Sequence, residues 1–307
     1  MHGHWRQSRS ASWVAGDEVG VVSRAALREF AVDTDFGRLT GLRGGTSGAP
    51  KVLALHGWLD NAASFVPLSR WLDGIELVAL DLPGHGASAH LPLVAGYTVV
   101  NMARAVFAAA DALGWDRFRL LGHSLGAGVA SLMTAAAPQR VERLLAIEAL
   151  GALAEDEART AVRLREAFCE TRSARRPLRL FADANSAVRA RVQVGGIHED
   201  AARLLVERGI IAVGDDGFTW RSDPRLTRDT AVRLSEAQVR DLLGAIECPT
   251  RVIYAEPAQR YFPEALRRAR FDCLKNGELM VLDGGHHLHM EQPDAVAEAI
   301  GDFLHAG

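Results

Sequence analysis

The sequence predicts an α/β fold in which helices cover both faces of a mostly parallel central sheet. Short, continuously apolar runs recur along the chain, as expected for strands that are buried on both faces of such a sheet. Longer segments with helical spacing of apolar residues lie between these runs, and this alternation is typical of doubly wound α/β proteins. The predicted strands cover 52–55, 75–80, 118–121, 144–147, 252–254 and 279–282, and the predicted helices cover 62–72, 99–113, 125–137, 264–270 and 293–304.

The two ends of this pattern carry their own signals. Residues 30–33 and 37–42 flank the short segment 34–36, which predicts an opening β-hairpin. A glycine-rich loop, 44–48, separates the hairpin from the first apolar run. The last helix begins near Pro293, a residue favoured in the first helical turn. One face of this helix carries its apolar residues, Val296, Ile300, Phe303 and Leu304.

The alternation of strands and helices stops over residues 151–245, which predicts an inserted helical cap. This region is rich in arginine and shows only helical patterns, the clearest at 159–168, 185–194 and 199–208. Since no Pro/Gly/Ser linker flanks it, we expect it to lie over the carboxyl ends of the strands, where open α/β sheets bind ligands. A separate domain is the alternative. The remaining segments are a core of 26–150 and 246–307 and a loose tail, 1–25.

Composition narrows the classes of partner and location. The 307 residues are 48% hydrophobic and 24% charged, as in ordinary globular proteins. The net charge of −3 gives no reason to expect nucleic acid or an anionic membrane as partner, and no apolar run is long enough to span a membrane. Three widely spaced cysteines and a polar start without a secretory signal predict reduced thiols and a cytoplasmic location. The oligomeric state is left open.

The segment Gly122-His123-Ser124-Leu125-Gly126 is the most informative motif. It has the form G-x-S-x-G and lies between an apolar run and a helix of small residues, which is the context of a nucleophile elbow. A β-carbon at Gly122 or Gly126 would collide with the neighbouring strand or helix. Ser124 would also lie at a helix N-terminus, where N–H groups can stabilise an oxyanion. The motif predicts a serine nucleophile, and an ordinary βα loop is the alternative.

Two loops that precede the elbow are expected to support the site. The segment 56–60 (HGWLD) follows the first apolar strand, where hydrolases of this shape supply one N–H of the oxyanion hole. We assign this hole to the backbone N–H groups of Trp58 and Leu125 and expect His56 to order the loop. The segment 81–88 (DLPGHGAS) predicts a tight turn around Asp81.

The predicted general base lies in the segment 284–293 (GGHHLHMEQP), after the last strand. A histidine on a glycine loop at this point matches the chain order Ser, acid, His. His286 follows the glycines directly and is the predicted base, with His287 and His289 as alternatives. Three histidines in four residues also suggest a metal. No Asp, Glu or Cys ligand set accompanies them at metal-site spacing, so no metal is predicted.

Two glutamates are candidates for the acid that supports the base. The common position follows strand 252–254, where Ala258 stands in place of the usual aspartate and Glu256 is the available carboxylate. The other position ends strand 144–147, where Glu148 follows a run of apolar residues. A buried carboxylate there needs a cation or donor, and an imidazole that becomes imidazolium is a suitable partner. We assign Glu148 as the acid, with Glu256 second; a purely structural hydrogen bond from Glu148 is the alternative.

With these motifs in order, the chain from Phe30 onward resembles the α/β-hydrolase superfamily. The histidine loop and the cap segments 198–203 and 220–225 resemble the serine hydrolase-like proteins. The segments 147–149 and 254–257 resemble haloalkane dehalogenases, and this likeness implies that Glu148 is the acid. Ser124 stands where dehalogenases have an aspartate nucleophile and Trp58 where they have a halide-binding asparagine, which argues against dehalogenation. The matching motifs are HGW at Trp58, DLPGHG at Asp81, GHSLGAG at Ser124 and GGHHLHMEQP at His286.

The resulting hypothesis is a serine hydrolase that cleaves small or medium acyl esters through an acyl-enzyme on Ser124. It needs no cofactor, and its predicted partner is a small-molecule ester or acyl substrate. The alternatives are a carbon–carbon bond hydrolase of ring-fission products, a cofactor-free oxygenase or peroxidase, and a non-catalytic binding protein on the same fold.

The cap is expected to decide which substrate is accepted. A basic stretch in it could steer an anionic acyl group, and a solvated helix face is the alternative. The candidate pocket residues are His123, Phe218 and Trp220, and the basic stretch consists of Arg172, Arg175, Arg176 and Arg179.

Overall fold

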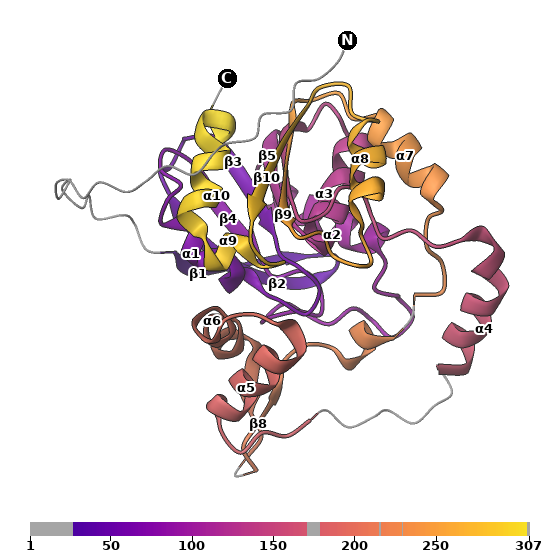
Figure 1. Ribbon diagram of the computed structural model, residues 1–307. Coiled ribbons are helices and arrows are strands. Elements are labelled where there is room, and N and C mark those ends of the chain that lie inside the picture. The colour runs from indigo at the N-terminus through magenta and orange to yellow at the C-terminus, as the bar shows by residue number, and fades with distance from the viewer. Residues whose placement is uncertain (1–26, 171–178, 215, 229, 306–307) are drawn as a thin grey trace.

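The computed structural model describes residues 27–170, 179–214, 216–228 and 230–305 (Figure 1). The predicted tail 1–25 and Arg172, Arg175 and Arg176 of the predicted basic stretch lie outside the described residues. The described chain forms an eight-stranded sheet in the order β1-β2-β4-β3-β5-β6-β9-β10. The strands of this sheet are β1 (Arg28–Thr34), β2 (Gly37–Gly45), β3 (Lys51–Leu55), β4 (Glu76–Leu80), β5 (Phe118–His123), β6 (Val141–Ile147), β9 (Thr250–Glu256) and β10 (Gly277–Asp283).

The pairing confirms the predicted mostly parallel sheet with an opening hairpin. β1 pairs antiparallel with β2, which in turn pairs antiparallel with β4. Every pairing from β4 to β10 is parallel. The carboxyl ends of β3, β5, β6, β9 and β10 therefore meet at one edge, and the loops that leave this edge carry the predicted functional residues.

Helices cover both faces of the sheet, because its strands are apolar on both sides. In β3, Leu53 and Leu55 join one buried cluster with α2 and α3, whereas Val52 and Ala54 join a second cluster with α1 and α10. The helices around the core are η1 (Ala62–Phe65), α1 (Val66–Ser69), α2 (Val99–Ala112), α3 (Leu125–Ala136), α7 (Glu236–Gly244), α8 (Glu264–Phe271), α9 (Leu288–Glu291), α10 (Pro293–Ile300) and η4 (Gly301–Leu304).

The region between β6 and α7 has its own small core. Ala187, Val188 and Leu205 are buried in a third cluster formed by the helices α5 and α6, and Figure 1 shows this group beyond one end of the sheet. The elements of this region are η2 (Glu157–Arg159), α4 (Thr160–Glu170), α5 (Ala184–Gly195), α6 (Glu199–Gly209), β7 (Ile210–Ala212), β8 (Phe218–Trp220) and η3 (Pro224–Thr227).

The expectation that this region contains helices only is wrong. β7 and β8 form an antiparallel hairpin, and Phe181 adds a bridge to Phe218. Gly214 and Gly217 both have positive φ, which lets the chain reverse between two strands of three residues. The helix α7 was not predicted, and its Val239 and Leu243 are buried in the core cluster that contains α3. Over the described residues, the helices are too short or too polar to cross a membrane.

Candidate active site

The nucleophile elbow has the geometry that its glycines predict. Ser124 has φ 51° and ψ −115°, a conformation that is uncommon for a residue with a side chain. A β-carbon at Gly126 would lie 1.9 Å from the carbonyl oxygen of Leu55, and one at Gly122 would lie 2.5 Å from the backbone of Ala127. The tight packing of β3, β5 and α3 therefore requires glycine at both positions and presents Ser124 at the edge of the sheet.

Ser124, His286 and Glu148 form one continuous chain of polar contacts. The Nε2 atom of His286 lies 3.0 Å from Ser124 Oγ, and its Nδ1 atom lies 3.1 Å from Glu148 Oε2. An ionised carboxylate only accepts hydrogen bonds, so the proton of a neutral His286 lies on Nδ1. Nε2 is then free to accept the hydroxyl proton of Ser124, as a general base requires.

Glu148 is held rigidly at the end of β6. Its φ is 60°, and its backbone N–H donates to the carbonyl oxygen of Ile253 at 2.9 Å. Its carboxylate is buried and accepts a hydrogen bond of 2.5 Å from the backbone N–H of Ala255. The other candidate acid, Glu256, is exposed at the end of β9, and only Glu148 of the two has its carboxylate bonded to His286.

A buried arginine that sequence reasoning missed lies beside this carboxylate. Arg267 of α8 places Nη2 3.4 and 3.5 Å from the two oxygens of Glu148, and it donates to the carbonyl oxygens of Phe262 and Ala255. Its guanidinium also lies over the Tyr254 ring, 4.6 Å from the ring centroid. Arg267 thus supplies the cation that a buried carboxylate needs. No local sequence pattern distinguishes it from the other two arginines of this helix, Arg268, which is partly exposed, and Arg270, which is buried and pairs with Glu236.

The two backbone N–H groups assigned to an oxyanion hole come from two loops at the carboxyl ends of neighbouring strands, β3 and β5. Leu125 is the first residue of α3, so its N–H has no acceptor within the helix. Trp58 lies in the loop after β3, and its half-exposed side chain donates from Nε1 to the carbonyl oxygen of Leu226 in the inserted region. His56 orders this loop, because its Nδ1 lies 2.7 Å from the Gly57 carbonyl oxygen and its Nε2 accepts from Leu82 N–H at 3.0 Å.

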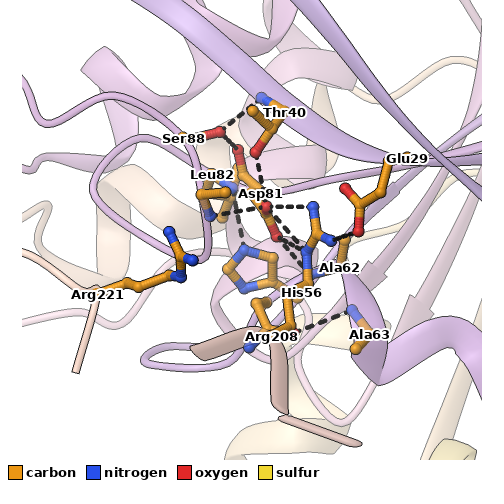
Figure 2. A network of polar contacts seen from close by, with 12 residues as sticks. Glu29, Thr40, His56, Ala62, Ala63, Asp81, Leu82, Ser88, Arg208 and Arg221 are labelled. Carbon is orange, nitrogen blue, oxygen red and sulfur yellow. Dashed lines mark hydrogen bonds and ion pairs between the residues drawn. The ribbon is translucent and has the colours of Figure 1, made fainter. Parts of the chain in front are cut away.

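The predicted turn around Asp81 is present and also contacts the inserted region. Asp81 accepts from the N–H groups of Ala62 and Ala87 and from the Thr40 hydroxyl. Figure 2 shows Arg208 of α6 reaching both Asp81 and Glu29. Burial by itself would raise the pKa of Asp81, but the hydrogen bonds and charge of Arg208, together with the N–H of Ala62, hold that pKa below its usual range.

The structure corrects one candidate for the substrate pocket. His123 is fully buried and its Nε2 lies 2.8 Å from the carbonyl oxygen of His286, so its side chain supports the histidine loop and does not line an open pocket. This follows from the alternation of side chains in β5, which turns the residue before Ser124 back into the protein. Phe218 and Trp220 are half-buried and pack against the third cluster, where Trp220 contacts the Phe181 ring edge-on.

The two alternative histidines are also buried, and they contact groups other than Ser124. His289 is fully buried against Phe65 and His123, and burial lowers its pKa to about 3. His287 is buried too, and its Nε2 lies 3.4 Å from the carboxylate of Asp60. Among the residues that the structure describes, no group of three or more His, Cys, Asp or Glu side chains is arranged to hold a metal ion.

Known proteins with similar sequences indicate the family to which this chain belongs. The sequence profile of the alpha/beta hydrolase fold family matches residues 50–293. A serine hydrolase-like protein of Dictyostelium discoideum is 31% identical over 83% of this chain and 74% of its own length. A carboxylesterase of Bacillus subtilis is 26% identical over 91% of this chain and 88% of its own length.

A solved structure of similar length supports the same placement. The crystal structure of a hypothetical protein from Pseudomonas aeruginosa PAO1 is 38% identical to this chain. It superposes with a TM-score of 0.85 over 90% of this chain and 98% of that one. These relatives support a hydrolase function. The chain belongs to the α/β-hydrolase family, and its place in that family is near the serine hydrolase-like proteins.

Proposed function

We propose that this protein is a carboxylic ester hydrolase in which Ser124, His286 and Glu148 act as nucleophile, general base and acid. The observation that carries the proposal is the unbroken contact from Ser124 Oγ through the His286 ring to the buried Glu148 carboxylate. The likeness to a carboxylesterase and to serine hydrolase-like proteins supports ester hydrolysis over the other reactions that use this machinery.

The first half-reaction would transfer the acyl group to Ser124. Oγ attacks the ester carbonyl carbon while His286 Nε2 takes the hydroxyl proton. The resulting oxyanion accepts hydrogen bonds from the N–H groups of Trp58 and Leu125, each worth about 3–4 kcal/mol in the transition state. The bond to the alcohol oxygen then breaks, and His286 returns its proton to that leaving oxygen.

The second half-reaction would release the acid. A water molecule attacks the acyl carbon and gives a proton to His286 Nε2, and the bond from the acyl carbon to Ser124 Oγ breaks as that proton passes to the serine oxygen. In both halves the Glu148 carboxylate stabilises the transient imidazolium and keeps Nδ1 protonated.

We further propose that the cap, residues 151–245, selects the acyl group of the ester. Trp58, in the loop after β3 that carries the proposed oxyanion-hole N–H, contacts this region, because its indole N–H donates to the carbonyl oxygen of Leu226. Substrate that enters between the cap and the sheet edge would meet Ser124 at the carboxyl ends of the strands. A small-molecule ester is thus the proposed partner.

Hydrolysis of p-nitrophenyl esters from acetate to laurate tests this proposal. Ser124→Ala should lower kcat/KM by about 10³-fold or more, since the nucleophile is lost. Ser69→Ala, which removes a hydroxyl that donates to the Val66 carbonyl oxygen on α1, is the matched control and should keep full activity. Full activity in Ser124→Ala would contradict the proposal. A wild type inactive on every ester would favour carbon–carbon hydrolysis, an oxygen reaction or a binding role.

A further inference from the structure

A second group of polar side chains surrounds the buried carboxylate of Asp60; its members are Asp60, His123, Arg191 and His287. The Asp60 side chain is only 1% exposed. Its Oδ1 atom pairs with the guanidinium of Arg191 on α5. Its Oδ2 atom lies 3.4 Å from His287 Nε2 and 3.8 Å from His123 Nδ1. The carboxylate of Asp60, in the loop after β3, therefore contacts the inserted region through Arg191, the loop after β10 through His287 and the segment around Ser124 through His123.

The direction of each hydrogen bond in this group follows from its chemistry. His123 Nε2 faces the carbonyl oxygen of His286 at 2.8 Å, and since a carbonyl only accepts, Nε2 carries the proton. Burial and the neighbouring His289 hold the pKa of His123 well below its usual value, so this ring is neutral and Nδ1 has no proton. His123 cannot donate to Asp60. The donors to this carboxylate are His287 and Arg191.

These contacts bear directly on the alignment of the reacting atoms. His287 follows His286 in the chain and is the N-cap of α9, so a fixed His287 ring fixes the loop that carries His286. His123 precedes Ser124 and holds the backbone carbonyl of His286 at the same time. The distance of 3.0 Å between His286 Nε2 and Ser124 Oγ thus depends on His123 and His287, and both of these side chains lie beside the Asp60 carboxylate.

We infer that Asp60 is a positioning residue for the proposed reaction, and that its ion pair with Arg191 makes docking of the inserted region a condition for aligning His286 with Ser124. The inference rests on the proposed function. A buried carboxylate that loses its cation must find other donors or admit water, and either change would displace the His287 ring. The inserted region would then act on kcat as well as on substrate affinity.

A second ion pair of the same kind provides a matched control. Arg208 of α6 pairs with the buried Asp81 of the core, as Figure 2 shows. The other groups that donate to this carboxylate are two backbone N–H groups and the hydroxyl of Thr40. Loss of Arg208 therefore removes the contacts of one arginine to Asp81 and Glu29 of the core without removing a partner of His123 or His287.

The experiment compares Asp60→Asn, Arg191→Met, their double variant and Arg208→Met by kcat, KM and the rate of fluorophosphonate labelling of Ser124. Asp60→Asn keeps the size of the side chain, and circular dichroism with thermal melting checks that each variant folds. We expect Asp60→Asn and Arg191→Met to lower kcat and the labelling rate by about tenfold or more, because small misplacements of reacting groups are costly. KM should change by less than about threefold in both, since substrate contacts are kept.

The remaining variants distinguish a loss of positioning at the reacting residues from a general loss of stability. The double variant should be no worse than the more impaired single variant, because both changes break one interaction. Arg191→Lys, which keeps the positive charge, should restore much of the rate lost in Arg191→Met. Arg208→Met should lower the melting temperature and keep the labelling rate near that of the wild type.

Two results would overturn the inference: unchanged kcat in Asp60→Asn and Arg191→Met, or an equal loss of labelling in Arg208→Met. Failure of the proposed function looks different, because the wild type itself would then neither hydrolyse esters nor react with the fluorophosphonate. In that case the positioning role fails as well.

Discussion

The sheet edge and the inserted region, which we propose to be a cap, differ in how their residues are held in place. At the edge, Ser124 and Glu148 directly follow buried strands, and backbone hydrogen bonds to neighbouring strands fix both residues. The inserted region contacts the core through long side chains as well, of which Arg191 and Arg208 form ion pairs with the buried carboxylates of Asp60 and Asp81. The difference suggests that the chemistry belongs to the edge and substrate choice to the cap. The Arg191–Asp60 pair is the point where the two would be coupled.

The largest expected effect is at the edge, in the choice of acid. Glu148→Gln should lower kcat by about 10³–10⁴-fold, as loss of the acid does in serine hydrolases, because an uncharged amide cannot stabilise the imidazolium. The kcat of Glu256→Gln should stay within about threefold of the wild-type value, since an exposed carboxylate that is not bonded to His286 contributes little. Steady-state kinetics on one ester decides between them. A larger loss in Glu256→Gln would move the acid to β9.

A smaller effect is expected when the elbow is overpacked. Gly126→Ala would place a β-carbon 1.9 Å from the Leu55 carbonyl oxygen, so β3 or α3 must move. We expect the free energy of unfolding to fall by about 3 kcal/mol, together with most of the activity. Gly96→Ala is the control, because its β-carbon would meet nothing closer than 3.9 Å. Urea unfolding measures both, and a neutral Gly126→Ala would contradict the packing described for the elbow.

The buried histidines of the core should make the fold sensitive to acid. Burial lowers the pKa values of His85 and His289 to about 3, from 6.5 in the unfolded chain. Between these values the unfolded chain binds the protons, so stability is full above pH 6.5 and falls as the pH decreases. The free energy of unfolding should drop by about 1.4 kcal/mol per pH unit for each histidine below pH ~6.

Urea titrations from pH 8 to pH 4.5 measure this slope. His289→Gln should reduce the slope by the contribution of one histidine, about 1.4 kcal/mol per pH unit. The variant itself is expected to be less stable than the wild type at pH 8. An identical slope in the variant would show that His289 does not stay neutral in the folded protein.

The smallest effect on chemistry is expected in the cap. Trp220→Ala removes a ring that packs on Phe181, and it should raise KM for medium-chain esters severalfold while kcat changes by less than about threefold. Kinetics across the p-nitrophenyl ester series, with circular dichroism to confirm folding, measure both constants. A collapse of kcat would contradict the division of roles between edge and cap.

The core and its site were largely predictable from sequence. Its strands are apolar on both faces, and the candidate site residues follow strand ends in a set chain order. Local patterns therefore predicted that Ser124 and His286 meet at one edge, where their side chains lie 3.0 Å apart. Glu148 could be placed beside them because a carboxylate directly after a buried apolar run has few acceptable environments.

What escaped prediction depends on contacts between distant segments. Arg267 lies 119 positions from Glu148, and Arg191 lies 131 positions from Asp60. No local pattern marks either arginine as the partner of a buried carboxylate. The hairpin of β7 and β8 has strands of three residues, too short to show a period of two. The motif around Ser124 also says nothing about the side chain of His123, whose burial follows from the register of β5.

Trapping of the acyl-enzyme tests the central claim most directly. The protein is mixed with p-nitrophenyl acetate, quenched with acid within the burst phase, digested and examined by peptide mass spectrometry. The account predicts an acetyl group on Ser124, absent from Ser124→Ala and accumulating about 10³-fold more slowly in Glu148→Gln. Ester turnover without an adduct on Ser124, or with the acetyl group on another residue, would contradict it.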